Sequence, residues 1–231
     1  MDSSTSNALG KRITIAMITM NEETAVGTVI KNIKTIAPEA EIIIVDSSQD
    51  NTADIAEKSG ATVIRQLPPQ GYGPAMELAL RTGQREVIIT MDCDNTYPVE
   101  KILELAALVL EKKHDLVNAS RLKTKPQAMP WLNYLGNLFF SWIASIVFFK
   151  KFTDLHSGMR AYRKSMLDNL QFAAKGAALP VELLIKPFVH GYKLHEIFID
   201  YHERTGKSKM RPFDSAWWTL KRIIKIRMFA R

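Results

Sequence analysis

The sequence predicts an open α/β domain with a mostly parallel β-sheet, and three observations support this. Short apolar runs alternate with longer helical patterns over residues 12–120. The apolar runs are rich in consecutive Ile and Val, which is typical of strands that helices cover on both faces. Polar residues follow most of these runs, at the edge where open α/β sheets bind ligands.

The first predicted strand is the run RITIAMIT at 12–19, and the next two are EIIIVD at 41–46 and ATVIRQ at 61–66. Helical patterns at 23–36 and 51–59 separate these strands. Neighbouring parallel strands need such a crossover, and an α-helix usually provides it. The chain is therefore expected to open with two consecutive βαβ units.

The same alternation continues to residue 120. A helix is expected at 74–83, followed by the strand EVIITMD at 86–92, a helix at 98–112 and the strand DLVNAS at 115–120. Ligands of open α/β sheets bind outside the carboxyl ends of the strands. The residues just after each strand are therefore the candidates for a site.

Four of the five strand-end segments are rich in acids, amides, hydroxyls or glycine. The segments are TMNEE (19–23), DSSQDNT (46–52), QLPPQGYG (66–73), DCDNTYP (92–98) and SR (120–121). No G-x-G-x-x-G follows the first strand, and the chain contains no G-x-x-x-x-G-K-[S/T]. The dinucleotide fingerprint and the P-loop are therefore excluded, and phosphates, if bound, need another neutralising group.

Asp92 and Asp94 stand two residues apart directly after an apolar strand. Two such carboxylates can converge on one hard divalent ion such as Mg²⁺, which completes its shell with water and substrate phosphates. Asp at a strand end also commonly caps a turn or the following helix. The spacing alone leaves both interpretations open.

After residue 121 the alternation stops, and the segment 131–149 carries no formal charge. Its length permits a transmembrane helix. However, polar residues recur every four positions and predict a polar stripe along one helical face. The stripe consists of Asn133, Asn137, Ser141 and Ser145. We therefore favour a helix that lies in the membrane interface or packs on the domain over a membrane span, with a protein-buried helix as the alternative.

Three further elements are expected in the last third of the chain. The segment 178–192 has a helical pattern, and KLHEIFIDY at 193–201 reads as a strand. The ending, 213–231, can form an amphipathic helix whose tryptophans and interspersed basic residues are typical of a membrane interface. We therefore expect a basic helix at the C-terminal end.

The net charge of +7 is unevenly distributed. Residues 204–231 contain nine Lys and Arg against one acid, Asp214, which gives this segment a charge of +8. This asymmetry indicates an anionic partner such as lipid headgroups, nucleic acid or a phosphorylated substrate, although a solvated basic tail has the same composition. No recognised nucleic-acid motif accompanies the basic residues, so nucleic acid is the least favoured partner.

The N-terminal residues 1–11 are mostly polar and are expected to form a flexible tail without signal-peptide character. The chain has a single cysteine, Cys93, which excludes an internal disulfide and suits a reducing compartment. The sequence contains no cluster of Cys and His residues of the kind that binds zinc. The predicted location is therefore the cytoplasm.

Taken together, seven segments resemble the motifs of the family 2 glycosyltransferases of GT-A fold, particularly the polyprenyl-phosphate sugar transferases such as dolichyl-phosphate mannosyltransferase. They are ITMNEE, VDSSQDNT, GYGPAMELAL (71–80), DCDNTYP, SR (120–121), DLHSGMRAYRK (154–164) and ERTGKSK (203–209). Each is weak alone, but all seven occur in the order of the family. The resemblance implies a GT-A catalytic domain over residues 12–212, with 131–149 on the membrane or acceptor side.

The resemblance also implies a binding site for a nucleotide sugar. The residues that it places around the nucleotide are Thr19, Met20, Glu22, Asp46, Gly73 and Cys93. Of these, Asp46 contacts the base or ribose, and Cys93 lines the nucleotide with its backbone. Asp92 and Asp94 hold a Mg²⁺ or Mn²⁺ that bridges the diphosphate, with Thr96 at the position of a third ligand.

The remaining implied residues face phosphates or the acceptor. Arg121, Arg204 and Lys209 face the donor or acceptor phosphates. Asp154, Ser157 and Arg160 shape the acceptor side. The catalytic candidates are Asp94, Asp154, Arg160 and Arg204, and Asp154 serves either as a base or as a residue that orients Arg160.

The chain departs from the family pattern at three points. Ile18 replaces a proline, VDSSQDNT is one residue short, and Tyr97 replaces a histidine. These departures leave the donor nucleotide, GDP or UDP, undecided. The Q-x-x-R-W motif of processive synthases is absent, which favours transfer of a single sugar.

The predicted function is inverting transfer of one sugar from a nucleotide sugar to a polyprenyl phosphate, peripherally on the cytoplasmic membrane face. Anionic lipid is an expected partner, and a homo-oligomer or a separate membrane-anchoring subunit remains open. One alternative is a transferase with a soluble or glycan acceptor. The other is a non-catalytic sugar-nucleotide or membrane adaptor, in which the acidic turn only caps a helix.

Overall fold

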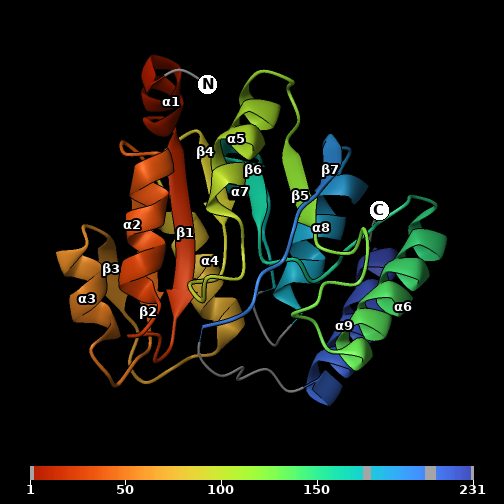
Figure 1. Ribbon diagram of the computed structural model, residues 1–231. Helices are drawn as coiled ribbons and strands as arrows, with labels where there is room; N and C mark the ends of the chain where they lie inside the picture. Colours follow the sequence, from red (N-terminus) through yellow and green to blue (C-terminus); the bar gives the residue numbers. More distant parts are fainter. Residues whose placement is uncertain (1–2, 174–177, 206–211, 230–231) are drawn as a thin grey trace.

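The structure is a computed structural model that describes residues 3–173, 178–205 and 212–229, and Figure 1 shows it as one layered α/β assembly. Its centre is a seven-stranded sheet with the strand order β3-β2-β1-β4-β6-β5-β7. The strands are β1 (Ile13–Thr19), β2 (Glu41–Asp46), β3 (Thr62–Arg65), β4 (Val87–Thr90), β5 (Leu116–Ser120), β6 (Arg160–Arg163) and β7 (Leu194–Phe198). The predicted mostly parallel sheet is confirmed.

Helices cover both faces of this sheet. The α-helices are α1 (Ser3–Gly10), α2 (Val26–Ile36), α3 (Thr52–Lys58), α4 (Tyr72–Thr82), α5 (Ile102–Leu110), α6 (Trp131–Phe148), α7 (Lys164–Asn169), α8 (Leu179–Val189) and α9 (Pro212–Phe229). A short 3₁₀ helix, η1 (Val99–Lys101), precedes α5. All helices expected from the sequence are present, with ends that differ by a few residues.

The sheet combines two parallel groups through one antiparallel strand. β1 pairs in parallel with β2 and β4, β2 pairs in parallel with β3, and β5 pairs in parallel with β7. β6 runs antiparallel between β4 and β5. The carboxyl ends of β1, β2, β4 and β5 therefore lie at the same edge, where the candidate residues were predicted.

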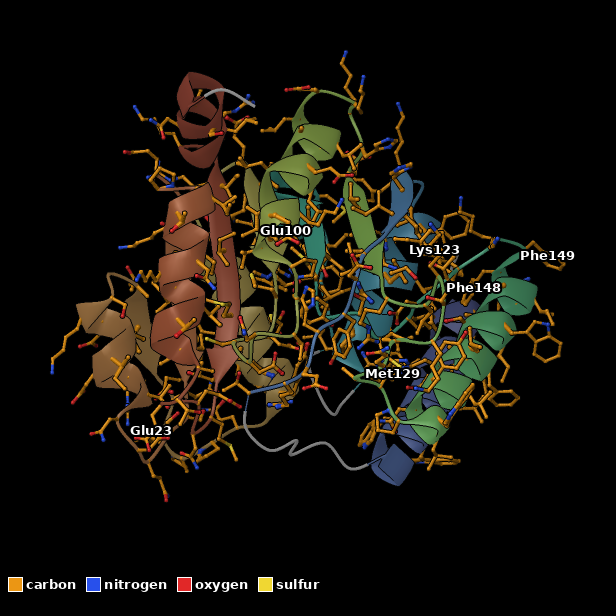
Figure 2. All side chains as sticks on the ribbon, viewed as in Figure 1. Glu23, Glu100, Lys123, Met129, Phe148 and Phe149 are labelled. Carbon is orange, nitrogen blue, oxygen red and sulfur yellow. The ribbon has the colours of Figure 1, made fainter. Side chains whose placement is uncertain are left out.

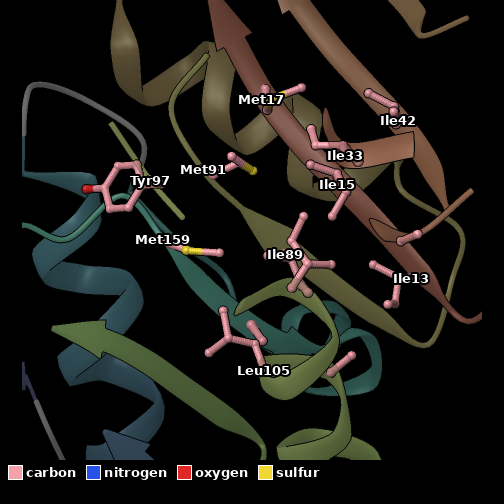
Figure 3. Packing of buried hydrophobic residues seen from close by; sticks show 14 of the residues in the cluster. Ile13, Ile15, Met17, Ile33, Ile42, Ile89, Met91, Tyr97, Leu105 and Met159 are labelled. Carbon is pink, nitrogen blue, oxygen red and sulfur yellow. The ribbon is translucent and has the colours of Figure 1, made fainter. Parts of the chain in front are cut away.

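Two hydrophobic clusters fix the sheet between its helical layers. Ile15, Met17 and Ile89 point to the cluster that α2 and α5 cover, which Figure 3 shows. Ala16 and Ile88 point to the opposite cluster, which α4 and α8 cover. Consecutive strand residues are buried on both faces, as the runs of Ile and Val predicted.

The N-terminal segment differs from its prediction. Residues Ser3–Gly10 form α1 rather than a flexible tail, and Leu9 is buried against the core. Backbone hydrogen bonds from Lys11 to Asn7 and from Arg12 to Leu9 close the end of this helix. The physical reason is that Leu9 gives the polar segment an apolar contact with the domain.

α6 turns much of its apolar side away from the protein. The exposed residues are Trp131, Leu132, Leu135, Leu138, Phe139, Trp142, Ile146 and, at its end, Phe149. Figure 2 shows Phe149 pointing outward from the end of α6. Ser141 is buried, and the hydroxyl of Ser145 donates to the carbonyl of Ser141 at 2.6 Å. This part of the predicted polar stripe therefore faces the domain.

Among the described helices, α6 is the one whose length and composition would let it cross a membrane. Its mean hydropathy is 1.3, and 11% of it is buried. α6 packs beside α9, and both lie at the same side of the domain (Figure 1). Trp217 and Met228 of α9 are also exposed. This side of the protein therefore presents a large apolar surface, of a kind that marks an interaction site.

Candidate active site

The acidic turn after β4 is held in one conformation by local hydrogen bonds. Asp94 Oδ1 accepts hydrogen bonds from the backbone N–H of Thr96 at 3.1 Å and from its hydroxyl at 2.5 Å. Asn95 between them has a φ of 68°, which Asn tolerates better than most residues. Thr96 is buried and orients Asp94, and its expected role as a third metal ligand stays a prediction.

Arg204 brings two acidic strand-end segments together. Its guanidinium lies 3.0 Å from a carboxylate oxygen of Glu22, after β1, and 3.1 Å from Asp94 Oδ2. The backbone of the same segment is attached to the turn, because Thr205 N donates to the Asp94 carbonyl at 2.9 Å. Three parts of the sequence that were predicted to share a site therefore meet here.

The electrostatics of the turn favour a bound cation. Burial, followed by the charge of Asp94, raises the pKa of Asp92 to about 7. Two carboxylates that are withdrawn from water and repel each other are stabilised by a positive ion between them. Among the described residues, no group of three or more His, Cys, Asp or Glu forms a metal site. The pair therefore suits an ion such as Mg²⁺ or Mn²⁺, which can take its other ligands from water and substrate phosphates.

Gly158 allows the loop before β6 to pass close to Asp92. A Cβ atom at this position would lie 3.0 and 3.1 Å from the carboxylate oxygens of Asp92 and 3.1 Å from the hydroxyl of Tyr97. The backbone N–H of Gly158 donates to that hydroxyl at 2.6 Å. Tyr97, which replaces the usual histidine of the family, thus ties this loop to the acidic turn.

Replacing Gly158 with Ala should displace the Asp92 carboxylate and lower the affinity for Mn²⁺ about tenfold, on the order of 1.4 kcal/mol. Mn²⁺ binding followed by electron paramagnetic resonance measures this change. Gly136→Ala in α6 is the control, because its added Cβ meets nothing within 4 Å. Equal Mn²⁺ affinity in both variants would contradict the role of Gly158.

Asp46 lies at the end of β2 in a closed hydrogen-bond network. Its carboxylate accepts hydrogen bonds from the hydroxyls of Thr19 at 2.6 Å and Ser48 at 2.5 Å. Arg65 at the end of β3 forms an ion pair with it at 2.9 Å, and the side chain of Arg65 is 41% exposed. Asp46 itself is fully buried, so the structure places Arg65, rather than Asp46, at the surface of this corner.

Asp154 pairs with Arg121 instead of the expected Arg160. Its two oxygens accept hydrogen bonds from Arg121 Nε at 2.7 Å and Nη2 at 3.0 Å. The backbone N–H of Arg121 and that of His156 each donate to the same carboxylate at 3.1 Å. Burial alone would raise the pKa of Asp154, but the charge and hydrogen bonds of Arg121 hold this pKa below its ordinary value. A fully buried carboxylate with this set of donors is a poor base.

Arg160 is a structural residue in this fold. Its guanidinium donates to Asn118 Oδ1 at 2.7 Å, to the carbonyl of Leu155 at 2.8 Å and to the carbonyl of Pro180. The side chain is 1% exposed. The expectation that Arg160 faces the acceptor is therefore corrected, because its hydrogen bonds hold β6 and the adjoining loops together inside the domain.

The other expected residues have varied positions. Ser157 is buried and donates to the carbonyl of Ala119 at 2.5 Å. Cys93 is part of the hydrophobic core, where burial raises the pKa of its thiol. Gly73 is buried in the first turn of α4, whereas Met20 is 43% exposed after β1. Lys209 lies outside the described residues.

Sequence reasoning missed the roles of Arg65, Tyr201 and Gly158. The ring of Tyr201 contacts Arg121, with 5.3 Å between the guanidinium carbon and the ring centroid, and packs edge-on against Tyr97. The available signals were weak: Arg65 is the second-to-last residue of one predicted strand, and Tyr201 is the last residue of another. Their partners come from distant segments, which spacing along the chain does not reveal.

His156 connects the Asp154 loop to the two outer helices. Its Nε2 lies 2.8 Å from the Thr219 hydroxyl on α9, and its ring packs edge-on against Phe140 of α6 at a centroid distance of 6.0 Å. Burial lowers the pKa of His156 from 6.5 to about 4. The neutral ring is thus the form that the folded protein accommodates.

This pKa predicts acid destabilisation. The unfolded chain takes up a proton near pH 6.5 but the folded chain only near 4, so stability is complete above 6.5 and falls as the pH decreases between these values. The loss amounts to about 3 kcal/mol. Denaturant unfolding of wild type and His156→Gln at pH 7 and pH 4.5 measures it. The variant should lose less stability than wild type, whereas the surface variant His202→Gln should match wild type.

Comparison by sequence places the chain in a known family and identifies similar proteins of known name. Residues 14–171 match the protein family described as glycosyl transferase family 2. The chain is 39% identical over 215 residues to the dolichyl-phosphate hexose transferase of Haloferax volcanii, with 93% of both chains covered. It is 27% identical over 212 residues to the low-salt glycan biosynthesis hexosyltransferase of the same organism, with 89% of this chain and 51% of that protein covered.

Solved structures with the same fold include glucosyl-3-phosphoglycerate synthase of Mycobacterium tuberculosis. Its complex with uridine diphosphate superposes with a TM-score of 0.75 at 19% identity, over 99% of this chain and 85% of that chain. Its complex with Mn²⁺, UDP-glucose and glycerol 3-phosphate gives a TM-score of 0.74 at 20% identity, over 100% of this chain and 84% of that chain. At this identity the likeness establishes the fold alone.

Proposed function

This chain belongs to glycosyl transferase family 2 and is a glycosyltransferase of GT-A fold, and we propose that it transfers one hexose to a polyprenyl phosphate. The proposed donor is a UDP- or GDP-linked sugar, and the transfer inverts the anomeric centre. The relative named dolichyl-phosphate hexose transferase, similar over nearly the whole chain, supports this acceptor. Membership of the family argues against the adaptor alternative.

The donor diphosphate is proposed to bind at the acidic turn. Asp92 and Asp94 would hold the Mg²⁺ or Mn²⁺, which when bound stabilises negative charge on the leaving diphosphate. Arg204 forms ion pairs with Glu22 and Asp94 and so lies at the same place. Its guanidinium can bind a phosphate oxygen by exchanging one carboxylate partner, which adds to the electrostatic stabilisation.

The acceptor phosphate is proposed to bind near Arg121, which Asp154 and Tyr201 hold in place. A phosphate monoester is already ionised near neutral pH, because its second pKa is about 6. It therefore attacks without a general base, and the buried Asp154 is needed only to position Arg121. The rate then depends mainly on orientation of the two substrates.

The apolar surface of α6 and α9 is proposed to seat the enzyme peripherally on the cytoplasmic membrane face. Trp131 and Trp142 of α6 and Phe149 directly after it are exposed, and α9 adds basic residues such as Lys221 and Lys225. Aromatic and basic residues together are typical of helices that lie in the membrane interface. In this membrane-bound orientation, the prenyl chain, which stays in the membrane, would lie on the same side of the protein as Arg121.

The observation that carries this proposal is the acidic turn with Arg204, set in a family 2 domain that exposes an apolar helix. The test is a donor screen with UDP-glucose, UDP-galactose, GDP-mannose and related sugars, using a polyprenyl phosphate in detergent. Glycolipid and free nucleoside diphosphate are measured together. One donor should give equal amounts of both, and nucleoside diphosphate without glycolipid would contradict the acceptor.

A soluble acceptor is the second candidate, and 3-phosphoglycerate is the compound to test, because the fold neighbours are named for synthesis of glucosyl-3-phosphoglycerate. The same donor screen with 3-phosphoglycerate tests it. Transfer to 3-phosphoglycerate but not to the polyprenyl phosphate would replace the first proposal. The exposed apolar face of α6 would then need another explanation, such as contact with a second chain.

A further inference from the structure

We propose that a basic cavity between α8 and α9 binds the phosphate headgroup of an anionic membrane lipid. This inference rests on the proposed seating of the enzyme on a membrane. The cavity has a volume of about 110 Å³, and the side chains of Lys186, His190, Arg222 and Lys225 line it together with Glu182. It is separate from the acidic turn, none of whose residues lines it.

The cavity contains more positive charge than its acid can balance. Arg222 forms an ion pair with Glu182, and Lys186 lies 3.4 Å from the same carboxylate group. With Lys225, three cations thus stand against one carboxylate. An anion in the cavity would offset this excess positive charge, and the phosphodiester of a phospholipid headgroup carries one negative charge.

Arg222 occupies a position where α9 would ordinarily have an apolar residue. Among the side chains of α9 that the structure describes, the buried ones are Thr219, Arg222, Ile223 and Ile226, at the spacing of one helical stripe. Burial lowers the pKa of Arg222 and also that of Lys186. Burying a charged side chain on the inward face of a helix costs free energy of folding. Proteins in which apolar residues replace a buried ion pair are often as stable as the original protein. The presence of Arg222 in this buried stripe therefore indicates a task beyond packing.

The size and rim of the cavity suit a lipid headgroup. Pockets for drug-sized ligands have volumes of roughly 300–1,000 Å³, so this cavity takes only a small group such as a phosphate. Its wall includes Val189, Ile226 and Phe229, and Phe229 is 73% exposed. Ile224 and Met228 on the same part of α9 are exposed as well. Apolar side chains at the rim of a basic cavity match a lipid, whose headgroup phosphate is attached to acyl chains.

The test compares three variants of the full chain that each lose one positive charge. Lys225→Gln and Lys186→Gln remove cations from the cavity. Lys221→Gln is the matched control, because Lys221 is an exposed residue of α9, lies against the ring of Trp218 and does not line the cavity. Sedimentation with vesicles of phosphatidylcholine, with or without phosphatidylglycerol, measures the affinity of each protein.

Wild type should bind the vesicles that contain phosphatidylglycerol more tightly than the neutral vesicles. Diffuse attraction to an anionic surface accounts for about fivefold per cation, and Lys221→Gln should lose this much. Lys225→Gln and Lys186→Gln should lose about 25-fold, because they also remove a direct contact with the headgroup. Equal losses in all three variants, or no preference of wild type for the anionic lipid, would overturn the proposal.

A second arm separates a lipid from a free anion. Inorganic phosphate at millimolar concentration should leave vesicle binding of wild type nearly unchanged at constant ionic strength, and displacement by it would overturn the lipid assignment. Transfer by wild type to a short-chain polyprenyl phosphate in detergent is measured in parallel. If wild type transfers the sugar but shows no preference for anionic vesicles, only the lipid-binding role of the cavity is rejected. If wild type transfers no sugar, the proposed function is rejected.

Discussion

Replacing Asp94 with Asn is expected to lower kcat about a thousandfold, equivalent to roughly 4 kcal/mol of transition-state stabilisation. Asp94 has two tasks in the proposed site, since it forms half of the carboxylate pair and also binds Arg204 at 3.1 Å. The variant keeps the size of the side chain and the acceptor oxygen for Thr96. The loss would therefore report the missing charge rather than a collapsed turn.

Two measurements are needed, the rate of glycolipid formation and the binding of Mn²⁺ without nucleotide. Both should weaken in Asp94→Asn and in Asp92→Asn, while Asp200→Asn, which changes an exposed acid near the same loop, should behave as wild type. The two active-site variants should differ in metal-free stability. Asp92→Asn removes the carboxylate whose pKa is raised to about 7 by burial and then by repulsion from Asp94, so this variant should be at least as stable as wild type. Unchanged Mn²⁺ affinity in both variants would contradict a metal at this turn.

The parallel part of the fold could be predicted because its signals are local. β1 and β2 are apolar runs bounded by polar residues, and their predicted ends agree with the structure to within one residue. β6 was not predicted, because Arg160 and Arg163 make the segment Arg160–Arg163 half basic. Arg160 donates a hydrogen bond to the amide oxygen of Asn118, and Arg163 pairs with the carboxylate of Asp115; both partners are more than forty residues away in the chain. A tertiary partner of this kind leaves no pattern in the strand itself.

The direction in which α6 faces could not be predicted from its polar stripe. A polar stripe usually faces water, but Ser141 and Ser145 face the loop that contains Phe152, whose backbone N–H donates to Ser145 at 3.0 Å. Phe140, Ile143 and Val147 pack against the core, while larger apolar residues such as Trp131 and Trp142 are left exposed. Periodicity identifies that two faces exist, and only the packing partner decides which one is buried.

The candidate site was predicted as a set of strand ends, and the structure brings Glu22, Asp94 and Arg204 together there. Their roles in catalysis stay predictions. The pairing of the buried charged residues could not be predicted from the sequence. Asp154 was placed with Arg160 because they share a motif. In the structure Arg121, just after β5, pairs with Asp154 instead, and Arg160 bonds to Asn118, which lies opposite it in the register of β5 and β6.

Replacing Asp154 with Asn is accordingly expected to act through Arg121. The variant leaves the Arg121 guanidinium, whose side chain is 9% exposed, without its charged partner. Breaking a buried pair by removing one member typically costs about 3 kcal/mol or more. The free energy of unfolding should fall by roughly this amount at pH 7, and the KM for polyprenyl phosphate should rise about tenfold because Arg121 is no longer held toward the acceptor.

The pH dependence distinguishes this positioning role from a catalytic base. If Asp154 were the base, its removal would abolish the acidic limb of the pH–rate profile and lower kcat about a thousandfold with KM unchanged. The four hydrogen bonds that Asp154 accepts and its lowered pKa argue for the opposite result, a kcat within about tenfold of wild type and an acidic limb that persists. Arg121→Lys provides the matching test from the other side of the pair. It keeps the charge that Asp154 needs but loses the bidentate geometry, so it should raise KM while retaining most of the stability that Asp154→Asn loses.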